Sequence, residues 1–218
     1  MLRIDQLRLL PDQPESDLTA KCARLLRTDP SSLRDLTVLR RAIDAREGLT
    51  FVYTVAVSAP QEAALLRRCR DKRVTAYTPE HYALPAPVAP PEVRPIVVGA
   101  GPAGLFAALV LARCGARPIL LERGQPVEQR SRDVTRFWRT GRLDTESNVQ
   151  FGEGGAGAFS DGKLNTGTRD LRHRYIMEQL VACGAPESIL TDALPHVGTD
   201  KLHICLLYTS PSPRDRSL

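Results

Sequence analysis

The chain has 218 residues, of which 42% are hydrophobic and 25% are charged, and its formal net charge is +5. These values are typical of a globular protein with one large domain or two small ones. Arginine and lysine are spread along the chain instead of forming one basic run, which argues against a nucleic-acid partner.

Several other classes of protein are also disfavoured. No apolar run has the length of a membrane span, and the first ten residues lack the apolar core and cleavage site of a signal peptide. The five cysteines are far apart and form no CxxC pair, which favours neither a disulfide framework nor a metal site. We therefore expect a cytoplasmic protein without a bound metal. The sequence indicates neither a substrate nor an oligomeric state.

Residues 1–80 are predicted to form an α+β domain. Apolar residues recur at helical spacing in residues 16–28, where Ser16 or Asp17 can cap the helix. Alternation in residues 49–58 places Phe51 and Tyr53 on one face with Val55 and Val57. The predicted order is strand, helix, strand, strand, helix and strand, at residues 2–10, 16–28, 35–45, 49–58, 60–70 and 73–79. This order predicts a ferredoxin-like fold.

Residues 81–94 are rich in proline and are predicted to form an extended linker. Residues 95–204 begin with a strand, a helix and a second apolar strand, which together predict an α/β Rossmann-like domain. The segment 125–144 is polar and has helical character, with Phe137 and Trp138 expected in the core. A glycine-rich segment follows, and residues 170–186 form an amphipathic helix.

The first strand of this domain leads into the spacing Gly99-x-Gly101-x-x-Gly104. Gly99 permits a tight turn, Gly101 allows a pyrophosphate to approach the backbone, and Gly104 lets the helix pack close to the strand. The free N–H groups at the N-terminus of the helix attract phosphate. We predict a dinucleotide phosphate site at Gly99, Gly101, Pro102, Ala103 and Gly104.

Glu122 follows the second strand, where its carboxylate can accept hydrogen bonds from both ribose hydroxyls of an adenosine. The same carboxylate would repel a 2′-phosphate, so NADP is not expected at this site. The chemistry of the turn does not distinguish FAD from NAD.

Resemblance to known families narrows the choice between FAD and NAD. The stretch from Val97 to Gly124 resembles the FAD-binding N-terminus of the two-dinucleotide-fold flavoproteins, in which GAGPAG and a terminal Glu-Arg-Gly recur. Three longer segments resemble a family of uncharacterised bacterial FAD-dependent dehydrogenases that also occurs in plastids: RRAIDAREGLTFVYTV, FWRTGRLDTESNVQFGEGGAGAFSDGKLNT and GAPESILTDALPHVGTDKL. This resemblance covers residues 1–204. It implies non-covalent FAD, contacts from Arg123 beside Glu122, an oxidoreductase, and a truncated FAD-binding domain.

Residues 150–165, QFGEGGAGAFSDGKLN, form a second glycine-rich loop whose N–H groups can bind an anion. In related flavoproteins the corresponding loop passes the FAD pyrophosphate and isoalloxazine. The resemblance therefore implies cofactor contacts for Gly154, Gly155, Ala156 and Gly157. It also puts Ser160, Asp161 and Lys163 near the flavin edge, and Lys163, which would stabilise an anionic reduced ring, is the candidate catalytic residue. His196 belongs either to a loop facing the active site or to a helix-capping turn.

Two alternatives to an FAD-dependent oxidoreductase remain open. The same unit could bind NAD in a nicotinamide-linked dehydrogenase. Alternatively, the chain could be a nucleotide-sensing binding module. In such a module Arg40, Arg41 and Arg46 of the N-terminal domain would bind an anionic partner such as RNA. The glycine-aromatic pattern of RNA-recognition sheets is absent from the sequence. The binding module is therefore the least favoured of the three functions.

The last fourteen residues, CLLYTSPSPRDRSL, have neither a helical nor a strand period. Eleven of them resemble a translated sequencing adapter. We therefore expect that the natural sequence continues differently after Ile204 and that residues 205–218 are not native. A nucleotide fold cut after its first strands is also expected to expose apolar surface.

Overall fold

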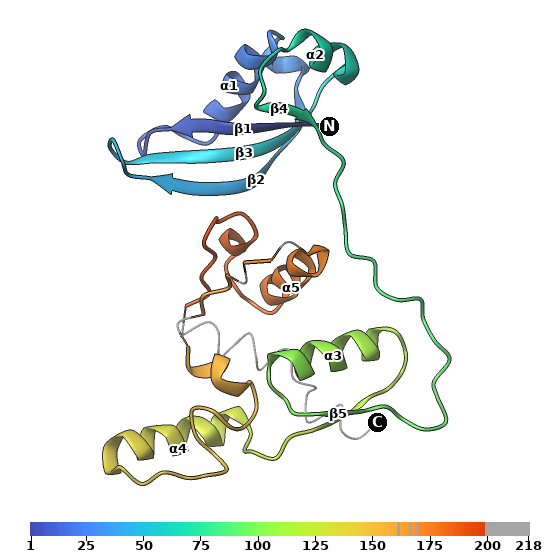
Figure 1. Cartoon of the computed structure of the whole chain (residues 1–218), viewed down its shortest axis with the longest axis vertical. Helices are drawn as coiled ribbons and strands as arrows, with labels where there is room; N and C mark the ends of the chain where they lie inside the picture. The colour runs from blue at the N-terminus through green and yellow to red at the C-terminus, as the bar shows by residue number, and fades with distance from the viewer. Residues whose placement is uncertain (161, 166, 169, 199–218) are drawn as a thin grey trace. The chain divides into compact units, whose positions relative to one another are not determined.

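The computed structural model describes residues 1–160, 162–165, 167–168 and 170–198 (Figure 1). The predicted tail and Asp161 lie outside the described residues. The chain divides into two compact units. The first contains Met1–Glu80 together with Leu190–Pro195, and the second contains His81–Ile189 and the segment that begins at His196. Residues 190–195 thus pack with the N-terminal domain, although the sequence assigns them to the second domain.

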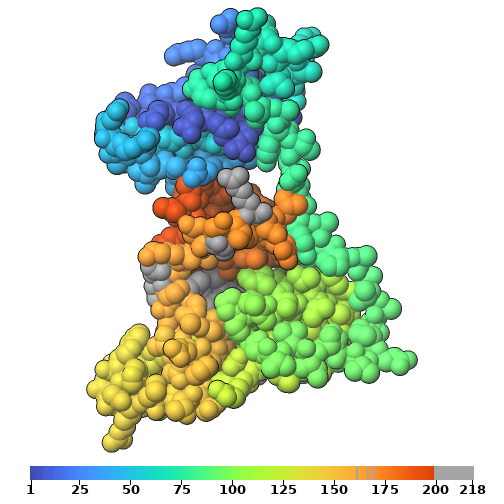
Figure 2. Space-filling model, in the orientation of Figure 1, coloured from blue at the N-terminus to red at the C-terminus, as the bar shows by residue number. Residues whose placement is uncertain are grey.

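The first unit has the element order predicted from the sequence. Its elements are β1 (Leu2–Leu9), α1 (Asp17–Leu26), the 3-10 helix η1 (Pro30–Ser32), β2 (Arg34–Asp44), β3 (Thr50–Ser58), α2 (Glu62–Arg68) and β4 (Val74–Ala76). The four strands form an antiparallel sheet in the order β2-β3-β1-β4, and Figure 1 shows both helices on one side of it. In the space-filling view, the atoms of this unit's helices and sheet lie in direct contact (Figure 2).

The core of this unit lies between the helices and one face of the sheet. The helices contribute Leu18, Cys22, Leu26 and Leu65, and β3 contributes Tyr53, Val55 and Val57 with the partly buried Phe51, as the alternation predicts. Ser16 precedes α1 but makes no side-chain capping bond, so the capping prediction is wrong for Ser16.

A bulge keeps β1 in register with this core. The pairing with β3 shifts between Ile4 and Leu7, and Gln6 has a φ of 62°. Successive strand residues point to opposite faces, so an extra residue reverses the alternation. Leu2 and Ile4 before the bulge and Leu7 and Leu9 after it are therefore all buried.

The short segment 190–195 pairs with β2 inside the first unit. The N–H of Arg41 donates to the carbonyl of Thr191 at 2.7 Å, and the N–H of Ala193 donates to the carbonyl of Arg41 at 2.7 Å. The Arg41 guanidinium also forms an ion pair with Asp192 at 2.8 Å. Arg41, which the binding-module alternative assigns to an anionic partner, thus pairs with a carboxylate of its own chain.

The second unit is built around a parallel β-α-β motif. Strands β5 (Ile96–Val98) and β6 (Ile119–Leu121) pair in parallel, and α3 (Pro102–Arg113) connects them. The elements that follow are α4 (Val127–Thr140), the 3-10 helix η2 (Gly155–Phe159), α5 (Leu171–Ala182) and the 3-10 helix η3 (Glu187–Leu190). The core joins α3, η2, α5 and η3 through Leu105, Ala158, Leu180 and Ile189, together with Ala185.

Residues 77–95 lie in neither helix nor strand. Part of this proline-rich segment contacts the end of α3: the Val88 N–H donates to the carbonyl of Cys114 at 2.8 Å. The Cys114 thiol in turn contacts the carbonyl of Pro85 at 3.4 Å. The segment therefore makes fixed contacts within the second unit.

The two parallel strands leave apolar side chains in contact with solvent. The exposed fraction is 60% for Ile96, 82% for Val98 and 49% for Leu121. Trp138 is 68% exposed, so its predicted place in the core is wrong. Val127 and Val134 of α4 are buried, and Trp138, four residues after Val134, lies on the same helical stripe. Trp138 belongs to the last turn of the helix, where this stripe is exposed. In the described part of the chain, no helix combines the length and apolarity needed to cross a membrane.

Candidate functional site

The predicted glycine turn connects β5 to α3. Gly99 has a φ of 94°, a conformation that favours glycine, and its N–H donates to the carbonyl of Leu121 at 2.7 Å. Gly101 precedes the first helical residue and Pro102 begins the helix, where the missing N–H of proline costs nothing. The turn therefore points the N-terminal N–H groups of a twelve-residue helix away from the strand.

Gly101 and Gly104 lack a side chain for different reasons. A Cβ at Gly104 would overlap the carbonyl oxygen of Gly99 and lie 3.6 Å from a methyl group of Val97, so this glycine lets the helix pack against the strand. A Cβ at Gly101 would meet no protein atom within 4 Å. The backbone at Gly101 is therefore accessible, as a bound pyrophosphate requires.

The Glu122 carboxylate lies against the same turn. Its Oε2 accepts a hydrogen bond from the Ala100 N–H at 2.7 Å, and its Oε1 accepts one from the Gly124 N–H at 2.8 Å. Burial opposes ionisation, but the backbone N–H groups of Ala100, Gly124 and Arg123 hold the pKa of this carboxyl below its ordinary value. Glu122 is thus a fixed anion that accepts a hydrogen bond from within the glycine motif.

The second glycine-rich loop contacts the first. The Gly154 N–H donates to the carbonyl of Ala100 at 2.8 Å. At Gly155, which has a φ of 61°, a Cβ would lie 3.2 Å from Cδ of Pro102 and 3.3 Å from Cα of Gly101. The structure therefore brings together two glycine segments that are about fifty residues apart in the sequence.

Arg130, which the sequence analysis did not single out, holds the second loop in place. It is fully buried, and its guanidinium donates to four backbone carbonyls. The bonds run from Nε to Asn148 at 2.7 Å, from Nη1 to Glu153 at 2.6 Å and Gly155 at 2.7 Å, and from Nη2 to Val149 at 2.7 Å. One side chain thus fixes the path of residues 148–155.

Burial lowers the pKa of the Arg130 guanidinium, while the nearby carboxylates of Glu122 and Glu153 act in the opposite direction. An arginine remains charged under such conditions. Its guanidinium carbon also lies 4.8 Å from the centre of the Phe159 ring. A signal for this residue existed in the sequence, because Arg130 lies on the same helical stripe as Val127 and Val134, where an apolar residue is expected.

Glu153 is a second residue that the sequence analysis missed. Its Oε2 accepts a hydrogen bond from the N–H of Val127 at 2.9 Å, at the positive N-terminal end of α4. Gly124 and Gly152 pack closely here, because a Cβ at Gly124 would lie 2.6 Å from the Gly152 nitrogen. The loop is therefore anchored at both Glu153 and Arg130.

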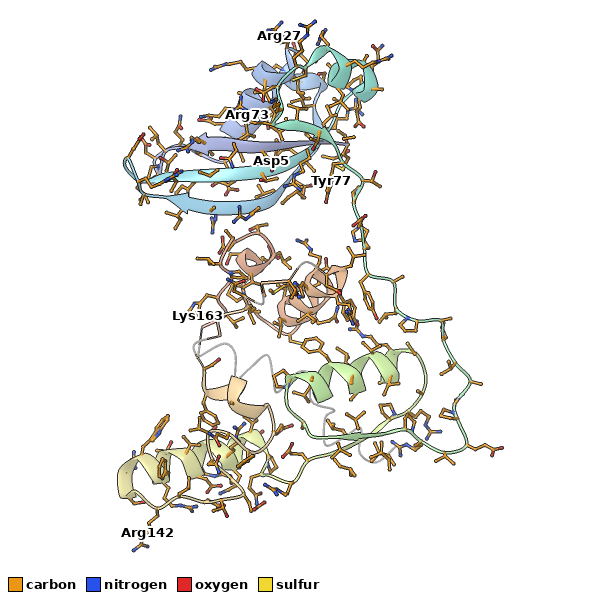
Figure 3. All side chains as sticks on the ribbon, viewed as in Figure 1. Asp5, Arg27, Arg73, Tyr77, Arg142 and Lys163 are labelled. Carbon is orange, nitrogen blue, oxygen red and sulfur yellow. The ribbon has the colours of Figure 1, made fainter. Side chains whose placement is uncertain are left out.

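The side chains of several other predicted residues make contacts elsewhere. The Arg123 side chain is 69% exposed and forms an ion pair with Glu146 at 2.7 Å. Lys163 is exposed (Figure 3) and forms an antiparallel bridge with His196. This bridge brings together two residues that the sequence suggested separately. The described contacts of Ser160 lie within its own loop.

The fold and these contacts define a dinucleotide-binding β-α-β unit. Residues 92–143 match the model of a family described as an FAD binding domain, which supports FAD as the cofactor of the second unit. The open backbone at Gly101, the anionic Glu122 and the adjoining glycine loop fit that cofactor. Residues 1–58 match a family described as a domain of unknown function (DUF8436).

The chain is also similar to a longer protein of Clostridium beijerinckii that carries the name "Uncharacterized protein". The two are 42% identical over 204 residues, which cover 92% of this chain and 38% of the relative. This chain therefore spans well under half the length of that relative.

Proposed function

We propose that this chain provides the FAD-binding part of an FAD-dependent oxidoreductase of the dehydrogenase type. The observation that carries the proposal is the contact between the two glycine loops at Ala100 and Gly154, beside the Glu122 carboxylate. A glycine turn such as Gly99–Gly104, taken alone, can bind many different nucleotides. A second glycine loop that packs against this turn provides further N–H groups, which suit a larger and partly planar ligand. Bound FAD would supply the electron-transfer chemistry.

In this proposal each residue has a separate task. The N-terminus of α3 and the open backbone of Gly101 receive the pyrophosphate. A carboxylate has about four acceptor positions, so Glu122, with three backbone donors, retains room for a ribose hydroxyl. Residues 154–157 extend the surface along the cofactor, and Arg130 positions them. Lys163 would act at the flavin edge, and Arg123 beside the adenosine.

The N-terminal unit is proposed to be ferredoxin-like, because its strand order β2-β3-β1-β4 and its two helices on one face follow that arrangement. A cytoplasmic location is also part of the proposal, supported by four described cysteines that are all free thiols.

Equilibrium dialysis with FAD and with NAD tests the cofactor proposal directly. The Gly101→Val variant should fold, because its φ of −72° suits valine and a Cβ at this position meets no protein atom within 4 Å, but it should block the pyrophosphate. The matched control is Ala112→Val on the exposed face of the same helix. We expect FAD to bind at least about tenfold more tightly than NAD and only Gly101→Val to lose it. Tighter NAD binding, or unchanged FAD binding by Gly101→Val, would contradict the proposal.

A further inference from the structure

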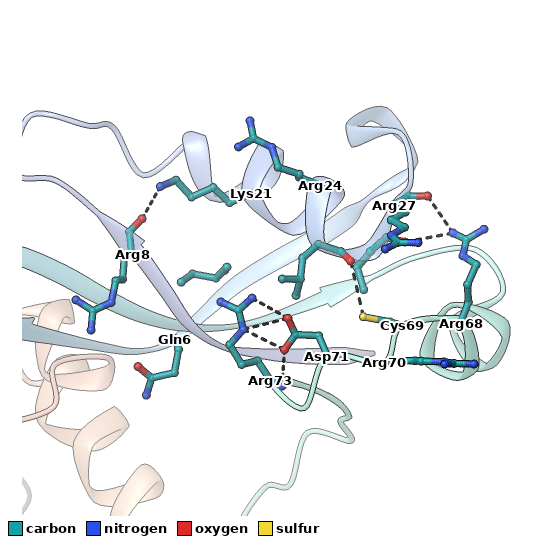
Figure 4. A pocket seen from close by; sticks show the side chains of 13 residues that line it. Gln6, Arg8, Lys21, Arg24, Arg27, Arg68, Cys69, Arg70, Asp71 and Arg73 are labelled. Carbon is teal, nitrogen blue, oxygen red and sulfur yellow. Dashed lines mark hydrogen bonds and ion pairs between the residues drawn. The ribbon is translucent and has the colours of Figure 1, made fainter.

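Several basic residues of the first unit line one hollow of about 950 Å³ (Figure 4). It lies beside the second half of β1, the C-terminal half of α1 and the segment that joins α2 to β4. Its lining has a single carboxylate, Asp71, and seven cationic side chains: Arg8, Lys21, Arg24, Arg27, Arg68, Arg70 and Arg73. Arg8 forms an ion pair with Asp44 outside this hollow, which leaves six positive charges in the lining against the single negative charge of Asp71. We call this hollow the basic groove.

The fold creates the groove by leaving part of β1 uncovered. Strand β4 pairs only with Leu2, Arg3 and Ile4, so the edge of β1 beyond the bulge borders the hollow. Gln6, in the left-handed conformation, is part of the lining. A non-glycine residue held in that conformation stores strain, which proteins concentrate at functional sites.

Four of the seven cations have partners of their own chain. Arg73 contacts Asp71 through both carboxylate oxygens and thereby lowers the pKa of that carboxyl to about 2. Arg8 forms an ion pair with Asp44 at 3.0 Å. Lys21 donates to the carbonyl of Arg8, and Arg68 donates to the carbonyls of Leu26 and Arg27. Carbonyl partners position a cation without neutralising it.

The other three cations are Arg24, Arg27 and Arg70. In the described part of the chain, their guanidinium groups make no hydrogen bond or ion pair, and all three residues are exposed. Like charges crowded around one hollow repel each other, so an anion that binds there would reduce the electrostatic repulsion between these guanidinium groups. Guanidinium groups match the oxygens of phosphate in paired hydrogen bonds.

We propose that the basic groove binds a small molecule that carries a polyphosphate chain. The cavity volume lies in the range of small-molecule sites. The lining contains no aromatic residue, whereas single-stranded nucleic acids are held by aromatic side chains on which their bases stack. The ligand is therefore recognised through several closely spaced negative charges. This site is separate from the glycine loops, and the proposal does not depend on FAD binding.

Calorimetric titration of the whole chain with inorganic tripolyphosphate, at near-physiological ionic strength, tests the proposal. Arg24→Gln with Arg70→Gln removes two unpartnered cations of the groove. Arg34→Gln with Arg40→Gln is the matched control, because it changes the net charge equally at two exposed arginines of β2 outside the groove. We expect the groove variant to bind tripolyphosphate at least about tenfold more weakly, and the control to bind as the unchanged chain does.

Three results would overturn the proposal. The first is no tripolyphosphate binding by the unchanged chain. The second is an equal loss in both double variants, which would indicate attraction by the net charge alone. The third is tighter binding of a single-stranded RNA oligonucleotide than of tripolyphosphate with the same groove dependence, which would assign the groove to nucleic acid. Thermal unfolding of both variants verifies that each remains folded.

Discussion

The Arg130 guanidinium donates a hydrogen bond of 2.7 Å to the carbonyl oxygen of Gly155. Gly155 in turn packs on Gly101 and Pro102 of the glycine turn. A side chain of α4 therefore controls how the second glycine loop lies against the turn that begins α3. This relationship makes the geometry of the proposed cofactor site depend on a residue outside both glycine motifs.

Replacing Arg130 should release the second loop. Arg130→Met leaves four buried or partly buried carbonyls without their donor, and we expect a loss of about 3 kcal/mol or more in local stability. Hydrogen exchange at the Gly154 N–H measures this loss. Arg130→Lys should rescue little, because an ammonium group cannot reproduce the forked geometry.

Arg132→Met is the control for this prediction. Arg132 lies on the same helix but is exposed, and its side chain donates hydrogen bonds to Gln129. Equal protection of Gly154 in the Arg130 and Arg132 variants would show that Arg130 does not hold the loop.

Gly104→Ala should destabilise the second unit, unlike Gly101→Ala. The new methyl group would overlap the carbonyl oxygen of Gly99, and the backbone cannot yield as a flexible side chain would. We expect Gly104→Ala to cost about 2 kcal/mol or more, whereas Gly101→Ala should leave the unfolding transition nearly unchanged. Urea unfolding of both variants, followed by near-ultraviolet circular dichroism, compares them. A smaller loss for Gly104→Ala than for Gly101→Ala would refute the packing role.

Glu122 should make the second unit less stable in acid. Its pKa is lower in the folded chain than the ordinary glutamate value. Its stabilising contribution is therefore fully present above that ordinary value, and it is lost as the pH falls through the lower value of the folded state. Glu122→Gln should lack this part of the acid sensitivity. Glu128→Gln, at an exposed position of α4, serves as the control.

The test is to measure the free energy of unfolding of the three proteins as the pH is lowered. The unchanged chain and Glu128→Gln should follow the same curve, while Glu122→Gln should flatten at low pH. Identical curves for all three would mean that the backbone bonds to Glu122 do not favour its charged form.

Local patterns in the sequence predicted the β-α-β unit because each of its steps is encoded by neighbouring residues. Gly99 provides the left-handed turn, Pro102 starts the helix, and Glu122 follows directly after β6. The structure places Glu122 against Ala100. The same reasoning misplaced Trp138, since helical spacing shows on which face a residue lies but not how far along the helix that face is covered.

The arrangement of distant segments could not be predicted in this way. Composition and spacing determined the two domains' secondary structure, the glycine turn and the carboxylate beside it. Only the tertiary structure decided that Arg130 is buried beneath the second glycine loop, because its four carbonyl partners come from residues 148–155. It likewise gathered seven dispersed cations into one groove, since charges far apart in sequence become neighbours only when β1, α1 and the α2–β4 segment meet.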